Sequence, residues 1–475
     1  MTVFGQGRSR VVPVPRVDNR RAWSMARLES RCDVPGVSAG ERFDVFYDGL
    51  WEDGSSAVWL NREIASRQAE SGFQELPKVL TMPREKAVAS MFSGRFRAER
   101  LRMLAALDSW RTLTCEQAAA FAGAPGLLDV RSTIPRSMWN LDLVDFGQFR
   151  GLAGRGFNRR GWLYRPSRGD AFESEVAPRL TWPEWMSVTA GMPFNSFGQF
   201  DRHNVLAAEL GLRLAEFADI GTVLGEKLSR AELLCSHLPA PLLPRGETKS
   251  ADLTVVRPDG LRIAVEITAN SSATFASKVA RWAALLDAAP LAESGLVVLF
   301  VVVAPGDLDG SESSAEAVAH RSLRNVVARR IAHAVRDYPG QVGDRVADRM
   351  FLASWQEWFP ARGRLGADFL TLRALSPSGP AGDLWQEKLL LGDSAMPLRA
   401  RNRDALLAVL ENAQTLAGVP LWARHRDAAP DPAQMLLTLA GRDEIPAPPA
   451  PSGLAVGAGV GVAGPTTLPA RLQWL

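Results

Sequence analysis

Two alternating runs and one continuous apolar run constrain the fold of this chain most strongly. Residues 249–270 read KSADLTVVRPDGLRIAVEITAN and alternate apolar with polar residues on both sides of Pro258-Asp259-Gly260. Period-two alternation predicts two strands, and Pro-Asp-Gly predicts the turn between them. Residues 295–304, GLVVLFVVVA, are apolar throughout, which predicts a strand covered on both faces. The sequence therefore predicts an α/β domain around a buried sheet.

Amphipathic helices are predicted around these strands. Apolar residues recur at helical spacing in residues 202–220, 273–288 and 315–337, and residues 349–359 resemble another strand. We expect the α/β domain to span residues 200–360.

Two carboxylates fall on neighbouring predicted strands. In the second strand Glu266 and Thr268 share a face with Ala264, and Asp252 lies near the start of the first strand. A hairpin can place such carboxylates side by side, and hard oxygen ligands of this kind hold Mg²⁺ in phosphodiester hydrolysis. We expect a magnesium site at Asp252 and Glu266. A strand pair with one Asp and one Glu also occurs by chance, so the surrounding order of elements carries this prediction.

A separate helical unit is predicted over residues 95–168. Residues 96–110 form one helical stripe, and LTCEQAAAFAG offers Thr114 as N-cap and Gly123 as C-cap of the next helix. A third helix is expected near Pro135, followed by two strand-like runs, LVDFG and GWLYRP, joined by the basic loop QFRGLAGRGFNRR. Three helices and a hairpin are typical of a winged helix-turn-helix domain.

Arginine is concentrated in this unit. Residues 95–168 hold thirteen arginines, six carboxylates and no lysine, although the whole chain has a net charge of only +3. Guanidinium groups bind phosphates and guanine edges, so double-stranded DNA is the expected partner. A solvated charged face and a protein-binding module remain open as alternatives. The candidate DNA-binding residues are Arg131, Ser132, Arg136 and Asn140 around the third helix, and Arg155, Arg159 and Arg160 on the wing.

The remaining segments carry less information. We interpret residues 1–45 as a flexible basic arm, 46–94 as a connector of unknown role, 361–440 as a helical extension, and 441–475 as a low-complexity tail. The basic N-terminus has no apolar stretch typical of a signal peptide, three scattered cysteines indicate no disulfide framework, and no apolar run approaches the ~18 to 20 residues of a membrane span, so we expect a cytoplasmic protein. No GxxxxGK[ST] loop or HExxH pair is present, which argues against an ATPase, a helicase or a zinc hydrolase.

Five short motifs follow one another within residues 202–286: RHNVLAAEL, GEKLSRAEL, ADLTVV, AVEIT and KVARWAALL. In this order they resemble the replication-relaxation family of actinobacterial plasmids, integrative elements and phages. The resemblance covers residues 95–305 and implies a winged helix followed by a PD-(D/E)xK nuclease-like domain. It also implies a role in replication, relaxation or transfer of a mobile element, with replication or transfer proteins of that element as partners.

The resemblance makes Asp252 and Glu266 the metal ligands and Glu226 an additional acidic position. The chain departs from the nuclease pattern at Ala251, where Pro is usual, and at Thr268, where the catalytic Lys of ExK is expected. A hydroxyl cannot stabilise charge at a phosphate as that Lys does, so Lys278 or Lys249 would have to replace it. An active endonuclease and a domain that binds DNA without cleaving it both remain open. His203 is either a general base or ligand, or a capping or packing residue.

Overall fold

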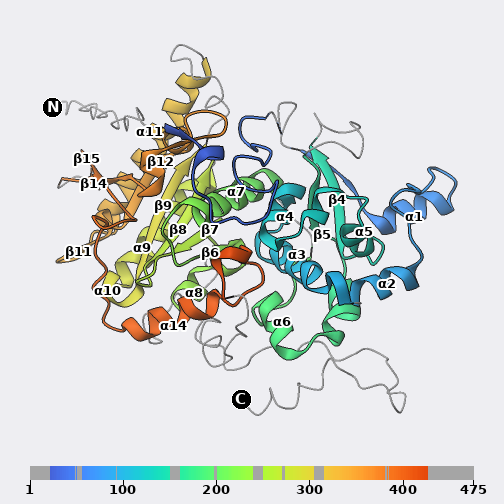
Figure 1. Cartoon of the computed structure of the whole chain (residues 1–475). Coiled ribbons are helices and arrows are strands. Elements are labelled where there is room, and N and C mark those ends of the chain that lie inside the picture. Colours follow the sequence, from blue (N-terminus) through green and yellow to red (C-terminus); the bar gives the residue numbers. More distant parts are fainter. Residues whose placement is uncertain are drawn as a thin grey trace, which may run out of the picture.

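The computed structural model describes residues 22–48, 50, 56–92, 94–149, 161–196, 200–238, 250–269, 273–303, 315–379, 382 and 384–425. These residues form a mixed α/β structure, as the sequence predicts. A large sheet with its helices occupies the left of Figure 1, and helices around a small sheet occupy the right. Helices α3 and α4 of the smaller unit contact α7 and β6 of the larger one.

The large sheet has seven strands in the order β15-β14-β12-β9-β8-β7-β6. Strands β6, β7 and β8 are antiparallel neighbours, whereas β9 and β12 run parallel to β8. The apolar run of the sequence is β9, the central strand, buried along its whole length. The bounds are β6 (Thr222–Gly225), β7 (Leu253–Val256), β8 (Arg262–Thr268), β9 (Leu296–Val302) and β12 (Met350–Ser354).

Helices cover both faces of this sheet, so its strands are apolar on both sides. Ile263, Val265 and Ile267 of β8 belong to the core that includes α7 (Asp201–Phe217). Ala264 belongs to a second core, which includes apolar residues of α9 (Ala273–Ala288) and α11 (Ala315–Asp337). The alternation of β8 thus directs Glu266, two residues after Ala264, toward the side of α9. Shorter helices complete this unit: α8 (Ala231–Leu234), α10 (Leu291–Ser294) and α12 (Trp355–Trp358).

The sheet continues beyond residue 360, where only helices are predicted. Strand β14 (Ala374–Ser378) pairs antiparallel with β12, and β15 (Leu384–Lys388) pairs antiparallel with β14. Helix α14 (Arg403–Ala413) is the one long helix of this region among the described residues. The helical extension expected at residues 361–440 therefore also contributes strands to the large sheet. Strand β15 forms the edge of the sheet and β14 lies next to it. Neither strand shows clear alternation, so their sequence carries little strand signal.

The smaller unit follows the predicted order of elements. Thr114 caps α4 by accepting a 3.1 Å hydrogen bond from the Gln117 amide, and Gly123 ends that helix with φ 60°, as predicted. Strand β3 pairs with β5, and β5 pairs with β4. The bounds are α3 (Arg97–Trp110), β3 (Leu113–Thr114), α4 (Cys115–Ala122), α5 (Thr133–Trp139), β4 (Val144–Phe149) and β5 (Leu163–Pro166), with α6 (Trp182–Thr189) after them.

The connector before this unit packs against it. Strand β2 (Ala57–Leu60) pairs with β4, α1 (Arg62–Glu70) follows, and α2 (Arg84–Phe92) packs on α5. Most of α5 is consequently buried, and Thr133 is its exposed residue.

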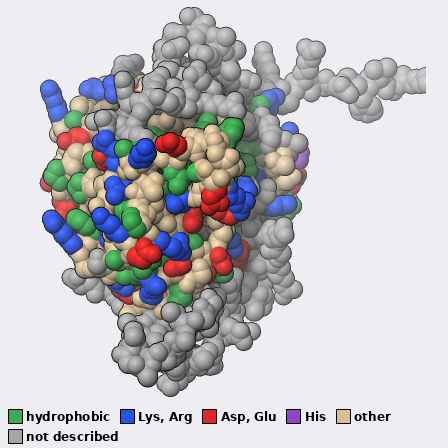
Figure 2. All heavy atoms as spheres, turned by 90° about the vertical axis from the view of Figure 1, so that its right-hand side faces the viewer, with side chains coloured by type: hydrophobic (Ala, Val, Ile, Leu, Met, Phe, Trp, Pro, Cys, Tyr) green, Lys and Arg blue, Asp and Glu red, His purple; other side chains and the backbone are tan. Residues whose placement is uncertain are grey.

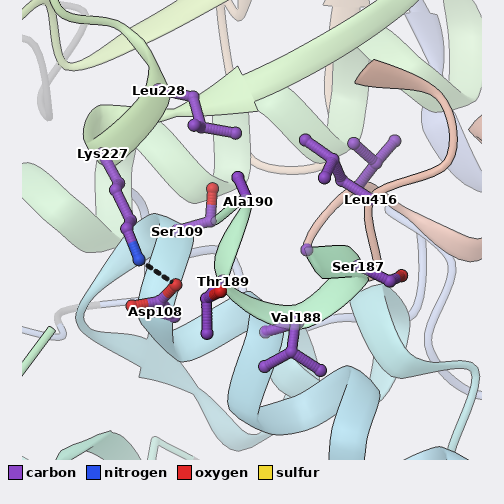
Figure 3. A pocket seen from close by; sticks show the side chains of 12 residues that line it. Asp108, Ser109, Ser187, Val188, Thr189, Ala190, Lys227, Leu228 and Leu416 are labelled. Carbon is purple, nitrogen blue, oxygen red and sulfur yellow. Dashed lines mark hydrogen bonds and ion pairs between the residues drawn. The ribbon is translucent and has the colours of Figure 1, made fainter. Parts of the chain in front are cut away.

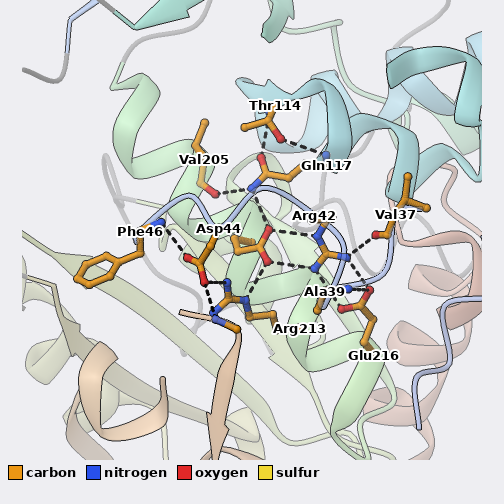
Figure 4. Close-up of polar contacts among 12 residues, drawn as sticks. Val37, Ala39, Arg42, Asp44, Phe46, Thr114, Gln117, Val205, Arg213 and Glu216 are labelled. Carbon is orange, nitrogen blue, oxygen red and sulfur yellow. Dashed lines mark hydrogen bonds and ion pairs between the residues drawn. The ribbon is translucent and has the colours of Figure 1, made fainter. Parts of the chain in front are cut away.

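Residues 22–48 also pack against the rest of the chain, rather than forming the flexible arm expected for residues 1–45. Strand β1 (Ala22–Ser24) pairs with β13 (Arg364–Gly366) near the short helix α13 (Ala367–Leu370). Arg42 forms buried ion pairs with Glu209 and Glu216 of α7, at 3.1 and 2.6 Å. Figure 4 shows this network, in which Arg213 also pairs with Asp44 at 3.3 Å. Burial acts to raise the pKa of Glu209, but the charges of Arg42 and Arg213 together outweigh burial and lower this pKa to about 2.

Candidate functional site

The hairpin of β7 and β8 brings the two predicted carboxylates together. Leu253 is the register partner of Val265, so Asp252 and Glu266 stand opposite each other one residue further along. The Asp252 carboxylate accepts a 2.6 Å hydrogen bond from the Ile267 amide. Glu266 is buried, and burial together with the charge of Asp252 raises its pKa to about 7 although Lys278 opposes the shift.

Helix α9 supplies a cation and a hydrogen-bond donor to Glu266. The Lys278 ammonium group forms an ion pair with Oε2 of Glu266, and the indole Nε1 of Trp282 donates to Oε1 at 2.6 Å. Burial lowers the pKa of Lys278, but Glu266 and Asp252 raise it more strongly, so the ammonium stays charged. Lys278, one of the two lysines expected to replace the one missing from ExK, thus lies beside Glu266. Thr268 is buried at the end of β8, and Lys249 lies outside the described residues.

Asp252, Glu266 and Lys278 form a carboxylate cluster, and Glu226 and His203 border it. Burial raises the pKa of Glu226, and the charge of Asp252 adds to this shift. The charges of Arg111 and Lys278 oppose it. His203, in the first turn of α7, is half-buried. Burial lowers its pKa, and Asp252 partly raises it. A neutral imidazole beside a carboxylate can accept a proton, which keeps His203 a candidate general base.

The donor set fits a divalent cation held by two carboxylates. Asp252 and Glu266 provide oxygen ligands on adjacent strands, and their mutual repulsion favours a cation between them. Among the residues that the structure describes, no group of three or more His, Cys, Asp or Glu side chains is arranged to hold a metal ion. Glu226 therefore does not complete a three-ligand set. Magnesium commonly binds through one or two carboxylates with water in the remaining positions, so two ligands suffice.

The residues predicted to read DNA around α5 are mostly engaged within the protein. Arg131 pairs with Asp129 at 2.8 Å, the Ser132 hydroxyl donates to the Gly126 carbonyl, and Arg136 lies 3.5 Å from the Val79 carbonyl. Asn140 is buried. Its amide donates to Leu80 and accepts from Met82 of the connector, so the prediction that Asn140 contacts bases is wrong for this arrangement. Three wing candidates lie outside the described residues: Arg155, Arg159 and Arg160.

Other arginines of the basic segment also have partners in their own fold. Figure 2 shows the face built by the right-hand side of Figure 1, where Lys and Arg side chains are interspersed with Asp and Glu. A single-sign basic surface is not seen among the described residues on this face. The pairs include Arg97–Glu184, Arg102–Glu99 and Arg165–Asp145, and Arg100 is buried against Ser137.

A small pocket lies beside the cluster, where the two units meet. It is lined by Ser109, Thr189 and Leu416 among others, and a buried ion pair between Asp108 of α3 and Lys227 closes one side (Figure 3). Lys227 also donates to the Pro193 carbonyl at 3.0 Å. Burial raises the pKa of Asp108 to about 6, although Lys227 opposes the shift. The two charged residues of its lining, Asp108 and Lys227, are thus paired with each other.

Two residues of the cluster were not predicted from the sequence. Trp282 lies four residues after Lys278 on α9, so helical periodicity places both on one face and could have identified it. Arg111 comes from the smaller unit, and its ion pair with Glu226 depends on how the units dock.

No family model, no curated protein and no solved structure matches this chain. None of the described helices is both long and apolar enough to cross a membrane.

Proposed function

We propose that this protein processes DNA as a metal-dependent endonuclease of the PD-(D/E)xK type. The observation that carries the proposal is the ion pair of Lys278 with Glu266 beside Asp252. It supplies two carboxylates and one ammonium group, the side-chain chemistry that phosphodiester hydrolysis with a divalent cation requires. The order of α7, β6, β7, β8, α9 and β9, with parallel β8 and β9, also agrees with a nuclease-like domain.

Each residue has a defined task in this proposal. Asp252 and Glu266 would hold Mg²⁺ or Mn²⁺, which would supply Lewis acidity and an activated water. Lys278 stabilises charge on the phosphate, and His203 accepts a proton from the attacking water. Since Lys278 approaches from α9, Thr268 is not required to act.

The smaller unit is proposed to hold duplex DNA near this site. Its order, helix, strand, two helices and a hairpin, with β3 paired to β5, supports the proposal of a winged helix. Because α2 covers α5, we assign DNA contact to the hairpin side of the unit rather than to α5. A role in replication, relaxation or transfer of a mobile element, together with proteins of that element, follows from the family resemblance alone.

A second candidate function is DNA binding without cleavage. It is favoured by the burial of Glu266, whose two oxygens already have partners in Trp282 and Lys278. A cation would have to compete with that ammonium group for the carboxylate. In this case the cluster is a structural remnant, and the winged helix carries the activity.

Nicking of a supercoiled plasmid separates these functions. The protein is incubated with Mg²⁺ or Mn²⁺, and Glu266→Ala and Asp252→Asn are compared with Asp219→Asn, a surface control whose side chain is 84% exposed. We expect wild type and the control to nick, and both site variants to lose at least about 100-fold in rate. If wild type binds the plasmid without nicking it, the binding function is correct. If it neither nicks nor binds, a protein-binding role for the winged helix remains.

A further inference from the structure

The end of helix α3 has a strained turn centred on Arg111. Its φ and ψ are 66° and −78°, and the Thr112 amide donates to the Trp110 carbonyl across it at 2.9 Å. This is a γ-turn of the rare kind, which residues with a Cβ adopt only at a cost in free energy. The neighbouring Thr112 hydroxyl donates to Asp201 of α7 at 2.7 Å and helps to hold the turn in place.

The turn directs the Arg111 side chain to the edge of the carboxylate cluster. Its Nε lies 2.7 Å from Oε2 of Glu226, and the charges of Asp252 and Lys278 also act on Glu226. Arg111 is therefore a cation that the smaller unit contributes to the site on the large sheet. About a quarter of the Arg111 side chain (26%) and a third of the Glu226 side chain (30%) remain exposed, so solvent reaches this edge.

The junction around Arg111 is held independently of this ion pair. One turn earlier on α3, Asp108 pairs with buried Lys227, the residue that follows Glu226. Gly225 lets β6 approach α3 so closely that an added Cβ would lie 2.4 Å from the Ser109 carbonyl oxygen. A partly exposed ion pair stabilises a fold only weakly. The free energy it contributes is smaller than the free energy that this backbone conformation costs. The stability gained from the Arg111–Glu226 ion pair therefore does not explain why the strained turn is present.

We propose that Arg111 binds a phosphate of the DNA backbone, and that in the free protein the Glu226 carboxylate pairs with the guanidinium group in the place of that phosphate. This inference rests on the proposed function, because it takes nucleic acid as the substrate. A guanidinium group can contact two phosphate oxygens at once, whereas Lys278 is assigned to the reacting phosphate. The site is then composite: the large sheet supplies the carboxylates, and the smaller unit supplies the group that positions the strand.

Three variants of the full-length protein test the assignment. Arg111→Gly removes the guanidinium and relieves the strained backbone, Arg111→Lys keeps the charge without the planar fork, and Arg345→Ala removes an exposed arginine paired with Asp348 outside the cluster. Affinity for a short fluorescent DNA duplex is measured by anisotropy over a series of salt concentrations, without divalent metal. Melting temperature is recorded for each protein.

We expect Arg111→Gly to melt no lower than wild type and yet to bind the duplex about tenfold more weakly, with a slope of log K against log salt smaller by about 0.9, the value for one phosphate contact. Arg111→Lys should keep the slope and recover part of the affinity, and Arg345→Ala should match wild type. A residue that only supports the fold would not change the salt slope.

The outcomes separate this inference from the proposed function. If wild type nicks plasmid and Arg111→Gly binds with unchanged affinity and slope, the inference is wrong and the nuclease function stands. If wild type fails to nick but Arg111→Gly still loses the slope of one contact, the phosphate contact stands and the nuclease function is wrong. If wild type does not bind the duplex at low salt, the inference is wrong; if it also fails to nick plasmid, the nuclease function is wrong as well.

Discussion

Lys278 on α9 neutralises Glu266 on β8, and this buried ion pair leaves Asp252 as the neighbouring carboxylate. The Glu266 side chain is 1% exposed, whereas that of Lys278 is 23% exposed. The carboxylate is thus enclosed by the fold, and its counter-ion reaches it from the solvent side. This asymmetry determines how the site should respond to mutation and to pH.

Removing Lys278 alone should destabilise the protein more than removing both charges. Lys278→Met leaves an enclosed carboxylate without a counter-ion, which typically costs about 3–5 kcal/mol, whereas Glu266→Gln with Lys278→Met leaves a neutral pair. Without lysine, the folded-state pKa of Glu266 rises further above its unfolded value, so the loss should be small near about pH 4 and largest above about pH 7. Urea unfolding at both pH values measures this. Equal losses for the single and double variants would contradict the buried pair.

The pH dependence of nicking should follow Glu266. Its pKa is raised from 4.5 to about 7, mainly by burial, so the folded protein holds this proton more tightly than the unfolded chain. The Glu266 contribution to folding is therefore most favourable below pH 4.5 and declines as pH rises toward about 7. Metal competes with the same proton, so Mn²⁺ affinity and nicking should increase through this range. Titration calorimetry and nicking rates measure both, and a rate that falls as pH rises through about 7 would exclude Glu266 as a ligand.

The buried network at Arg42 should contribute strongly to stability. Arg42→Ala removes the counter-ion shared by Glu209 and Glu216, and we expect a loss of about 3–5 kcal/mol in the free energy of unfolding. Arg401→Ala is the matched control, because Arg401 pairs with Glu293 through a side chain that is 79% exposed, and its loss should be about 0–1 kcal/mol. Denaturant unfolding compares the two. Similar small losses would mean that the network does not hold residues 22–48 in place.

The close contact at Gly225 should be intolerant of a methyl group. Gly225→Ala would place Cβ 2.4 Å from the Ser109 carbonyl oxygen, so α3 and β6 must separate, at a cost of about 1–3 kcal/mol. Separation of α3 and β6 also moves Arg111 away from the carboxylates of the large sheet, so duplex affinity should fall as well. Gly94→Ala is the control, since an added Cβ there meets no atom within 4 Å. Thermal melting and anisotropy provide the readouts, and wild-type behaviour of Gly225→Ala would show that the junction adapts.

The carboxylate pair could be predicted because strand geometry is local. Alternation fixes which residues of a strand share a face, and Pro258-Asp259-Gly260 fixes the turn, so the placement of Asp252 near Glu266 follows from about twenty residues of sequence. Lys278 was one of two predicted substitutes for the missing lysine. That Lys278 reaches Glu266 depends on how α9 packs against the sheet, which is a property of the tertiary structure.

The arginines show what composition cannot provide. Thirteen arginines in residues 95–168 predict a basic surface, but a count of charges does not include their partners. Arg97 forms an ion pair with Glu184, which is distant in sequence. Asn140 forms hydrogen bonds with the backbone of Leu80 and Met82 in the connector. Arg111 was beyond prediction for another reason, since nothing in the local sequence signals a positive φ at that position.

The pairing of β1 with β13 has a consequence for synthesis of the chain. Arg364 donates to the Ala22 carbonyl across 342 residues, so strand β1 cannot find its partner until most of the protein has left the ribosome. Contacts between residues this far apart in sequence form late, because the entropy of closing the long loop is lost before the contact stabilises the chain. The first strand of the described chain is thus among the last to be locked, and acquisition of protease resistance by residues 22–48 should mark completion of folding.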